Sequence, residues 1–396
     1  MPADIQKLKD HVAAEVDALR EELVDLSLRI HAHPETAFQE EQAATWLTGF
    51  LEGHGFRVLR GICDLPTAFR AELGDGAPRV ALLAEYDALP GIGHGCGHNL
   101  IGAASVGAAV AGRAVVEETG GTIVVVGTPA EEVYGGKVIM AERGAFDGLD
   151  AAMLCHPGSR NAAYARALAC AELEVEYFGR EAHAAARPEA GVNALDALII
   201  AFNGIAALRQ HMRGSARIHG IITDGGQAPN IVPGHTAGNF LVRAEDEAYL
   251  DELKERVIAC FQAGAQATGA RLEYRWGEAQ YAAMRTNTPL ADAYRRNLEA
   301  LGREVTEEPS RRSMGSTDMG NVSVLLPAIH PTIAIAPREV GAHSPEFARC
   351  AASEDGHRGL LDAAKALAMT AVDVLAGDEL REQMRQAFAA GRQSDD

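Results

Sequence analysis

Four short runs of almost uninterrupted apolar residues limit the folds that this chain of 396 residues can adopt. These runs occupy residues 79–86, 122–126, 151–155 and 332–336. Their lack of polar and apolar alternation is typical of strands that are buried on both faces. Helical stretches separate the first three runs, and this order indicates a largely parallel sheet with helices on both faces. We therefore expect an α/β fold.

The first thirty residues predict an amphipathic helix that begins this fold. Apolar residues recur there at steps of three and four, as they do on one face of a helix. They are Val12, Val16, Leu19, Leu23, Leu26 and Ile30. Such a face requires a core that covers it.

The middle of the chain has a different pattern. It predicts strands at 171–179, 217–223, 238–244 and 271–276, and helices at 192–208 and 249–268. We expect the buried face of the first of these helices to consist of Leu195, Ile199, Phe202, Ile205 and Leu208. The chain is thus predicted to form an α/β domain of residues 1–167 and 285–396, interrupted by an inserted α+β domain of residues 168–284.

Charge and composition exclude several classes of function. The net charge of −19, without a basic block, would repel the phosphates of a nucleic acid. The most apolar stretch, residues 100–112, is shorter than the ~20 residues of a membrane helix, and we expect a buried helix there. The N-terminal segment does not resemble an export signal, and six irregularly spaced cysteines favour reduced thiols. We expect a cytoplasmic protein without nucleic-acid or membrane partners.

Acidic, thiol and imidazole side chains follow the ends of the four predicted strands. They are Asp87, Cys96 and His98 after the first strand, Glu131 and Glu132 after the second, His156 after the third and His343 after the fourth. Open parallel sheets bind ligands beyond the carboxyl ends of their strands. We therefore expect these side chains to converge.

Five of these side chains are of the types that bind first-row metal ions. The five are Cys96, His98, Glu132, His156 and His343. A structural zinc site needs only four ligands, whereas five ligands and a bridging water suit two ions about 3.5–4 Å apart. Glu131 and Glu132 cannot point the same way on an extended segment. One is therefore expected to bind metal while the other accepts a proton from the water.

Each motif also has a simpler interpretation. A Cys-Gly-His triplet is often structural, a Glu-Glu pair is commonly a solvated turn, and a histidine after an apolar strand can be a core residue. Their coincidence at four strand ends favours the metal site. The glycines at 91, 93, 95 and 97 do not match the G-x-G-x-x-G of dinucleotide binding. A Cys96 nucleophile activated by His98 is disfavoured because no third group orients the pair.

Longer motifs resemble one known family. They are YDALPGIGHGCGHNLIG, GTPAEE, GREAHAAARPEAGVNALDAL, IHGIITDGGQAPNIVP and GSTDMGNVS followed by HSPEF. They are similar to motifs of the aminoacylase and carboxypeptidase-G family of dinuclear metallopeptidases, in particular its amidohydrolase branch with aminobenzoyl-glutamate hydrolase and β-alanyl-lysine-type dipeptidases. The resemblance covers nearly the whole chain. It implies a catalytic α/β domain and an inserted lid domain that forms a dimer contact.

The resemblance also implies roles for single residues. The implied metal ligands are Cys96, His98, Glu132, His156 and His343, the catalytic residues are Glu131, His183 and Asp87, and the substrate-binding residues are Asn230 and Arg243. Glu131 would be the general base, and Asp87 would orient a metal ligand. His183, in the lid, would bind the substrate carbonyl.

The chain departs from the wider family at one position. Where the family has His-x-Asp after the first strand, this chain has Glu85-Tyr86-Asp87, so one metal-binding histidine is missing. The resemblance implies that Cys96 and His98 compensate. Sulfur favours zinc, whereas the branch is associated with manganese. We expect two divalent transition-metal ions, either zinc or manganese.

These features predict metal-dependent hydrolysis of an amide bond in an N-acyl amino acid or a dipeptide-like substrate. A metal-bridging water would be the nucleophile and Glu131 the general base. We also expect a homodimer through the lid domain, in which His183 acts on the site of the partner. Two alternatives are a catalytically inactive small-molecule-binding relative, which would have lost Glu131 or a ligand, and a Cys96 thiol hydrolase, which would tolerate chelators.

Overall fold

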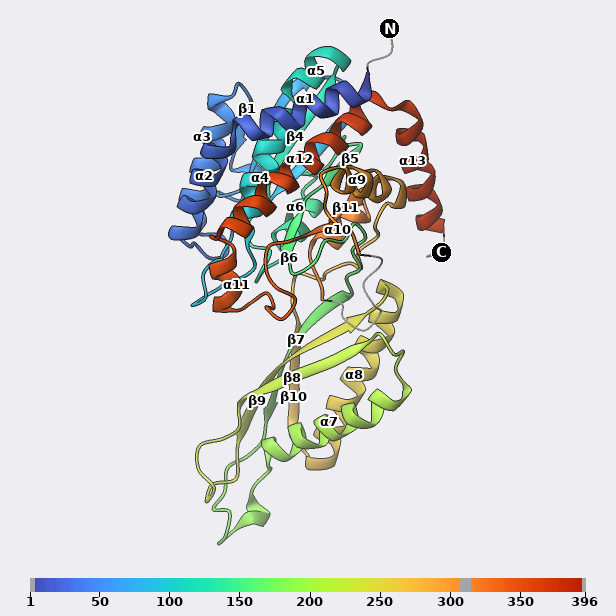
Figure 1. Cartoon of the computed structure of the whole chain (residues 1–396). Coiled ribbons are helices and arrows are strands. Elements are labelled where there is room, and N and C mark those ends of the chain that lie inside the picture. The colour runs from blue at the N-terminus through green and yellow to red at the C-terminus, as the bar shows by residue number, and fades with distance from the viewer. Residues whose placement is uncertain (1–3, 307–314, 394–396) are drawn as a thin grey trace. The chain divides into compact units, whose positions relative to one another are not determined.

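The computed structural model describes residues 4–306 and 315–393 (Figure 1). The described chain divides into two compact units. The larger unit, the α/β domain, contains residues 4–166, 284–306 and 317–393, and the smaller unit, the inserted domain, contains residues 167–283 and 315–316. The boundaries expected after residues 167 and 284 lie one residue from the two main transitions between these units.

The α/β domain contains a large sheet, a small sheet and the helices around them. Its helices are α1 (Ile5–Ala18), α2 (Arg20–Ala32), α3 (Glu41–Gly53), α4 (His98–Ala111), α5 (Arg113–Thr119), α6 (Gly136–Glu142), α9 (Thr288–Ala300), α10 (Met319–Ser323), α11 (Pro345–Cys350), α12 (Glu354–Ala376) and α13 (Asp378–Gln393). Its strands are β1 (Arg57–Arg60), β2 (Phe69–Asp75), β3 (Arg79–Ala84), β4 (Gly121–Gly127), β5 (Ala151–Met153), β6 (His156–Gly158), β11 (Ala328–Ile329) and β12 (Thr332–Ala334).

The large sheet confirms the predicted α/β class. Its strand order is β1-β2-β4-β3-β5-β11, and the pairings β4–β3, β3–β5 and β5–β11 are parallel. The strands β1 and β2 add an antiparallel edge. Every residue of β4 is buried, which requires layers on both faces of the sheet.

The prediction for residues 332–336 was wrong in one respect. The strand β12 does not join the large sheet but pairs in parallel with β6 in a separate sheet. The place beside β5 belongs to the short strand β11. Pro331 separates β11 from β12, and because proline has no N–H it cannot continue a ladder as a donor.

The predicted N-terminal helix is divided into α1 and α2. The break falls at Leu19, whose φ of −82° and ψ of 0° are not helical. All six apolar residues that predicted the helix are nevertheless buried. The helix α1 packs beside α12 in Figure 1, so both ends of the chain contribute to one core.

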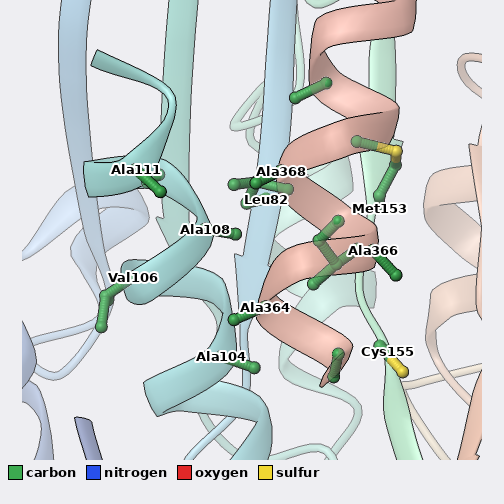
Figure 2. Close-up of a cluster of buried hydrophobic side chains, with 14 of the residues drawn as sticks. Leu82, Ala104, Val106, Ala108, Ala111, Met153, Cys155, Ala364, Ala366 and Ala368 are labelled. Carbon is green, nitrogen blue, oxygen red and sulfur yellow. The ribbon is translucent and has the colours of Figure 1, made fainter. Parts of the chain in front are cut away.

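The apolar stretch after the first strand forms a buried helix, as predicted. All residues of α4 except Val110 are buried. Residues 98–119 are long and apolar enough to cross a membrane by composition, but 83% of the apolar 18-residue stretch within them is buried inside the protein, which is typical of a core helix. Figure 2 shows alanines of α4 and α12, including Ala108 and Ala364, where these two helices face each other over the sheet.

The inserted domain has the predicted α+β composition. Its elements are β7 (Ala169–Phe178), α7 (Ala194–Leu208), β8 (Arg217–Asp224), β9 (His235–Ala244), α8 (Glu247–Thr268) and β10 (Arg271–Trp276). The strands form an antiparallel sheet in the order β10-β7-β9-β8. Alternate residues of β7 are buried beneath α7 and α8, which lie side by side in Figure 1.

The predicted buried face of α7 was partly wrong. Its buried residues are Ala194, Ala197, Leu198, Ala201 and Ile205, whereas Ile199 is 44% exposed. Alanine side chains let the helix approach the sheet and α8 closely, and this packing turns the larger Ile199 outward. The helix therefore carries an apolar side chain that its own domain does not cover.

Candidate metal centre

Tight turns bring the loop after β3 back to the start of α4. Gly97 has a φ of +79°, and a Cβ there would meet the ring of Pro157 at 2.9 Å, so only glycine fits. His98 is the first residue of α4. The backbone N–H of His343 donates to the carbonyl oxygen of Gly95 at 2.8 Å, which fastens the last of the four segments to this loop.

The five expected metal ligands converge in the α/β domain. The sulfur of Cys96 lies 3.4 Å from Nε2 of His156 and 3.5 Å from Nε2 of His343. A carboxylate oxygen of Glu132 lies 3.4 Å from His343, and its other oxygen lies 3.7 Å from His98. Distances of this size leave room for an ion that bonds to each atom at about 2.0–2.3 Å.

Asp87 forms hydrogen bonds with two of the expected ligand residues. Its Oδ1 lies 2.9 Å from Nδ1 of His98, and its Oδ2 accepts the backbone N–H of Glu132 at 3.0 Å. Burial opposes a charged imidazole, but the Asp87 carboxylate outweighs it and raises the pKa of His98 well above its usual value. The bond to Nδ1 directs Nε2 of His98 toward Glu132.

The expectation that Glu131 and Glu132 point in opposite directions was wrong. Each has an oxygen in one group with the His98 imidazole, in which all ligand atoms lie within 4.8 Å of one another. The segment is a turn and not a strand, and Ala130 before it has a φ of +61°. Burial raises the pKa of Glu131 well above its usual value, and the charges of Glu85 and Asp318 raise it further.

Sequence reasoning missed a buried ion cluster beside this group. Nζ of Lys137 lies 2.6 Å from Glu85 and 2.8 Å from Asp318, and all three side chains are fully buried. The other oxygen of Glu85 lies 3.6 Å from Nε2 of His98. The only signal for this cluster was the unusual glutamate after the first strand, and that residue is the one that replaces the family's histidine.

The residues present fit a metal centre. Nε2 of His98, Oε2 of Glu85 and Oε1 of Glu132 are buried and have no hydrogen-bond partner among the described residues. Such atoms are rare in folded proteins unless a water or an ion satisfies them. Thiol, imidazole and carboxylate groups are also the donor types that transition metals prefer.

The three expected residues of the inserted domain do not form one cluster within a chain. His183 is exposed, and its backbone forms an isolated antiparallel β-bridge with Ile231, the residue after Asn230. Arg243 lies near the opposite end of β9 from this loop, where it donates to Ser316 at 2.9 Å. The β9 segment between His235 and Arg243 is about 26 Å long at ~3.3 Å per residue.

The fold and the convergent side chains define a hydrolase of the metallopeptidase type. Residues 81–366 match the model of peptidase family M20/M25/M40. The chain is 39% identical to the Xaa-Arg dipeptidase of Mus musculus over 402 residues, which cover 98% of this chain and 93% of the relative. It therefore belongs to peptidase family M20/M25/M40, as the sequence motifs predicted, and hydrolyses amide bonds in a metal-dependent reaction.

Two further comparisons agree with this assignment. The chain is 35% identical to one of the subunits of p-aminobenzoyl-glutamate hydrolase from Escherichia coli strain K12, over 69% of this chain and 62% of the relative. Its fold is similar to that of the Bacillus subtilis YxeP protein, described as a dinuclear metal-binding peptidase from the M20 family. That likeness has a TM-score of 0.71 and 20% identity, and covers 91% of this chain and 99% of the other.

Proposed function

We propose that the protein is a dipeptidase with two divalent transition-metal ions, zinc or manganese, and that the ligands are Cys96, His98, Glu132, His156 and His343. The observation that carries this proposal is the charge of the buried centre. Its carboxylates are Glu85, Asp87, Glu131, Glu132 and Asp318. Lys137 balances one of these five charges and the Cys96 thiolate that a metal requires would add one, so two divalent cations would offset four of five negative charges. Buried charge without such balance is costly.

Glu131 is the proposed general base. Its carboxylate belongs to the same group as His98 and Glu132, and burial raises its pKa, so it holds an accepted proton more readily than an exposed glutamate does. When bound, the ions would polarise the substrate carbonyl and ease the loss of a proton from water. Glu131 then accepts this proton and passes it to the amine that leaves.

Asn230 and Arg243 are proposed to bind the substrate, and the names of the relatives suggest its class. The most similar of the relatives described above acts on Xaa-Arg dipeptides, and the net charge of −19 would attract a cationic substrate. Arg243 offers a guanidinium for the carboxylate of the substrate. A p-aminobenzoyl-glutamate substrate is the second candidate, supported by the Escherichia coli relative.

We further propose a homodimer formed through the inserted domain, with His183 acting on the site of its partner. The strand β8 is an edge of its sheet and carries Ile221 and Ile222, which are 64% and 43% exposed. Ile199 of α7 is exposed as well. The backbone of a dipeptide spans about 7 Å, so it cannot contact both Arg243 and the distant loop of His183 and Asn230 in one inserted domain, and Asn230 would act with His183 on the site of the partner.

A thiol hydrolase built on Cys96 has less support. Burial raises the pKa of the Cys96 thiol, so a reactive thiolate is disfavoured without a metal. The inactive-relative alternative has no support from the sequence either, since Glu131 and all five expected ligands are present.

Metal analysis and a substrate screen together test the proposed function. We expect about two transition-metal ions per active chain, and release of free arginine from Xaa-Arg dipeptides that stops after chelation and returns with added metal. p-Aminobenzoyl-glutamate serves as the competing substrate. Activity that survives complete removal of metal, but is lost on alkylation of Cys96, would favour the thiol mechanism.

A further inference from the structure

The loop that carries Glu131 and Glu132 begins at a residue in an unusual conformation. Ala130 is fully buried and has a φ of +61°, a region that residues with a side chain rarely adopt. Its carbonyl oxygen accepts the N–H of Gly136 at 3.1 Å. This bond joins the two ends of the loop of residues 130–136. The conformation of Ala130 therefore sets the direction in which the loop leaves β4.

One buried carboxylate holds this conformation. Oε1 of Glu40 accepts the backbone N–H of Ala130 at 3.0 Å, and the same oxygen accepts the N–H of Phe38 at 3.0 Å. Phe38 also has a φ of +61°. Oε2 of Glu40 accepts the hydroxyl of Thr67 at 3.0 Å, and the Glu40 side chain is fully buried.

Three further contacts restrain the same loop, one of which is the bond from the Glu132 N–H to Asp87 described above. The ring of Phe38 stacks on Tyr134 with centroids 5.6 Å apart, so the segment held by Glu40 also contacts the loop at Tyr134. Beyond the loop, Asp318 accepts the backbone N–H of Lys137 at 2.9 Å. Glu40 is the restraint that acts on the residue directly before Glu131.

We propose that Glu40 is a positioning residue for the hydrolysis of the amide bond. It holds Ala130 in the left-handed region, and Ala130 in turn directs the carboxylates of Glu131 and Glu132 toward His98. Misplacement of a catalytic group by about 1 Å can cost about 10²-fold in rate. This inference rests on the proposed function of Glu131 as the base and Glu132 as a metal ligand.

Variants of Glu40 distinguish the role of its hydrogen-bond acceptor oxygen from the role of its negative charge. Glu40→Gln keeps an oxygen that can accept both N–H groups, whereas Glu40→Ala removes it. Glu40→Asp keeps the charge but withdraws the carboxylate by one methylene group, and it serves if Glu40→Ala does not fold. Glu35→Ala is the matched control, because the Glu35 carboxylate accepts the backbone N–H groups of Gln42 and Ala43 in the helix α3.

The experiment measures kcat, KM and metal affinity of each folded, metal-loaded variant. We expect Glu40→Ala and Glu40→Asp to lower kcat by about 10²-fold with little change in KM, and to weaken metal binding through Glu132. Glu40→Gln and Glu35→Ala should stay close to the wild type. Ala130→Gly accepts a positive φ without strain, so the loss caused by Glu40→Ala should shrink in an Ala130→Gly background.

Two outcomes would overturn the inference. One is a folded Glu40→Ala or Glu40→Asp variant with wild-type kcat and metal affinity, and the other is an equal loss in Glu35→Ala. A wild-type protein that neither binds metal nor cleaves an amide would instead reject the proposed function, so the two failures are distinguishable.

Discussion

Asp87 and His98 form a carboxylate–imidazole pair at 2.9 Å, and the second oxygen of Asp87 holds the backbone of Glu132. One side chain thereby orients two expected metal ligands from different loops. We predict that Asp87→Asn lowers metal affinity by about 10–100-fold, the usual cost of losing such a partner. Competition with a chromogenic chelator measures this. Asp150→Asn is the control, since Asp150 accepts a backbone N–H at the other end of β3.

The two adjacent glutamates should respond differently to loss of charge. Glu131→Gln should leave the metal content nearly intact and lower turnover by ~10²–10⁴-fold, because a general base is lost. Glu132→Gln should lose metal. Elemental analysis of both purified variants, together with turnover at saturating substrate, tests the assignment. Equal metal loss in the two variants would contradict it.

Mixed dimers test whether His183 acts on the site of the partner. His183→Ala should lower turnover by about 10²–10³-fold with little change in metal content. In a heterodimer of His183→Ala and Glu131→Gln chains, one site would combine an intact Glu131 with an intact His183 of the opposite chain. Subunit exchange should then restore up to half of the wild-type activity per heterodimer. Heterodimers that form but stay inactive would show that His183 does not act in trans.

The buried Glu40 carboxyl predicts a pH-dependent difference in stability. Burial raises its pKa to about 7, from a usual value near 4.5. Burial favours the protonated carboxyl, so Glu40 contributes fully to the stability of the fold at pH values below its pKa in the unfolded chain. This contribution is lost as the pH rises through 7, its pKa in the folded protein. Glu40→Gln lacks this titration. Its free energy of unfolding relative to the wild type should therefore rise by about 3 kcal/mol between pH 4 and pH 8.

Urea unfolding of the wild type and of Glu40→Gln at several pH values measures this difference. Titration of other groups and loss of metal at low pH affect both proteins alike and cancel in the comparison. A difference that stays constant from pH 4 to pH 8 would show that the Glu40 carboxyl does not titrate in this range.

The sequence predicted elements whose patterns are local. The strands and helices of the inserted domain follow their alternation and helical periodicity closely, and β3 and β4 follow their apolar runs. The exposure of Ile199 was not predictable, because the alanines that take its place in the core carry little periodic signal. The side of α7 that packs inward depends on partners from distant parts of the chain.

At the site, residue types predicted the convergence of five side chains. They did not predict the buried residues that contact and orient those side chains. Lys137 is about 50 residues from Glu85 and about 180 from Asp318 in sequence, and nothing in its own segment indicates a buried charge. The orientation of Glu131 was also mispredicted, because a positive φ at an alanine such as Ala130 has no sequence signature. Both features depend on tertiary contacts.

The joint packing of α1, α4 and α12 in one core bears on the order of folding during synthesis. The core of the α/β domain needs α12, which spans Glu354–Ala376 and is translated late. The inserted domain draws its core from residues 169–283 and is complete much earlier. Because domains fold as units as they leave the ribosome, we expect the inserted domain to fold first. The helix α1, which packs chiefly on α12, must then wait with part of its apolar face uncovered until α12 emerges.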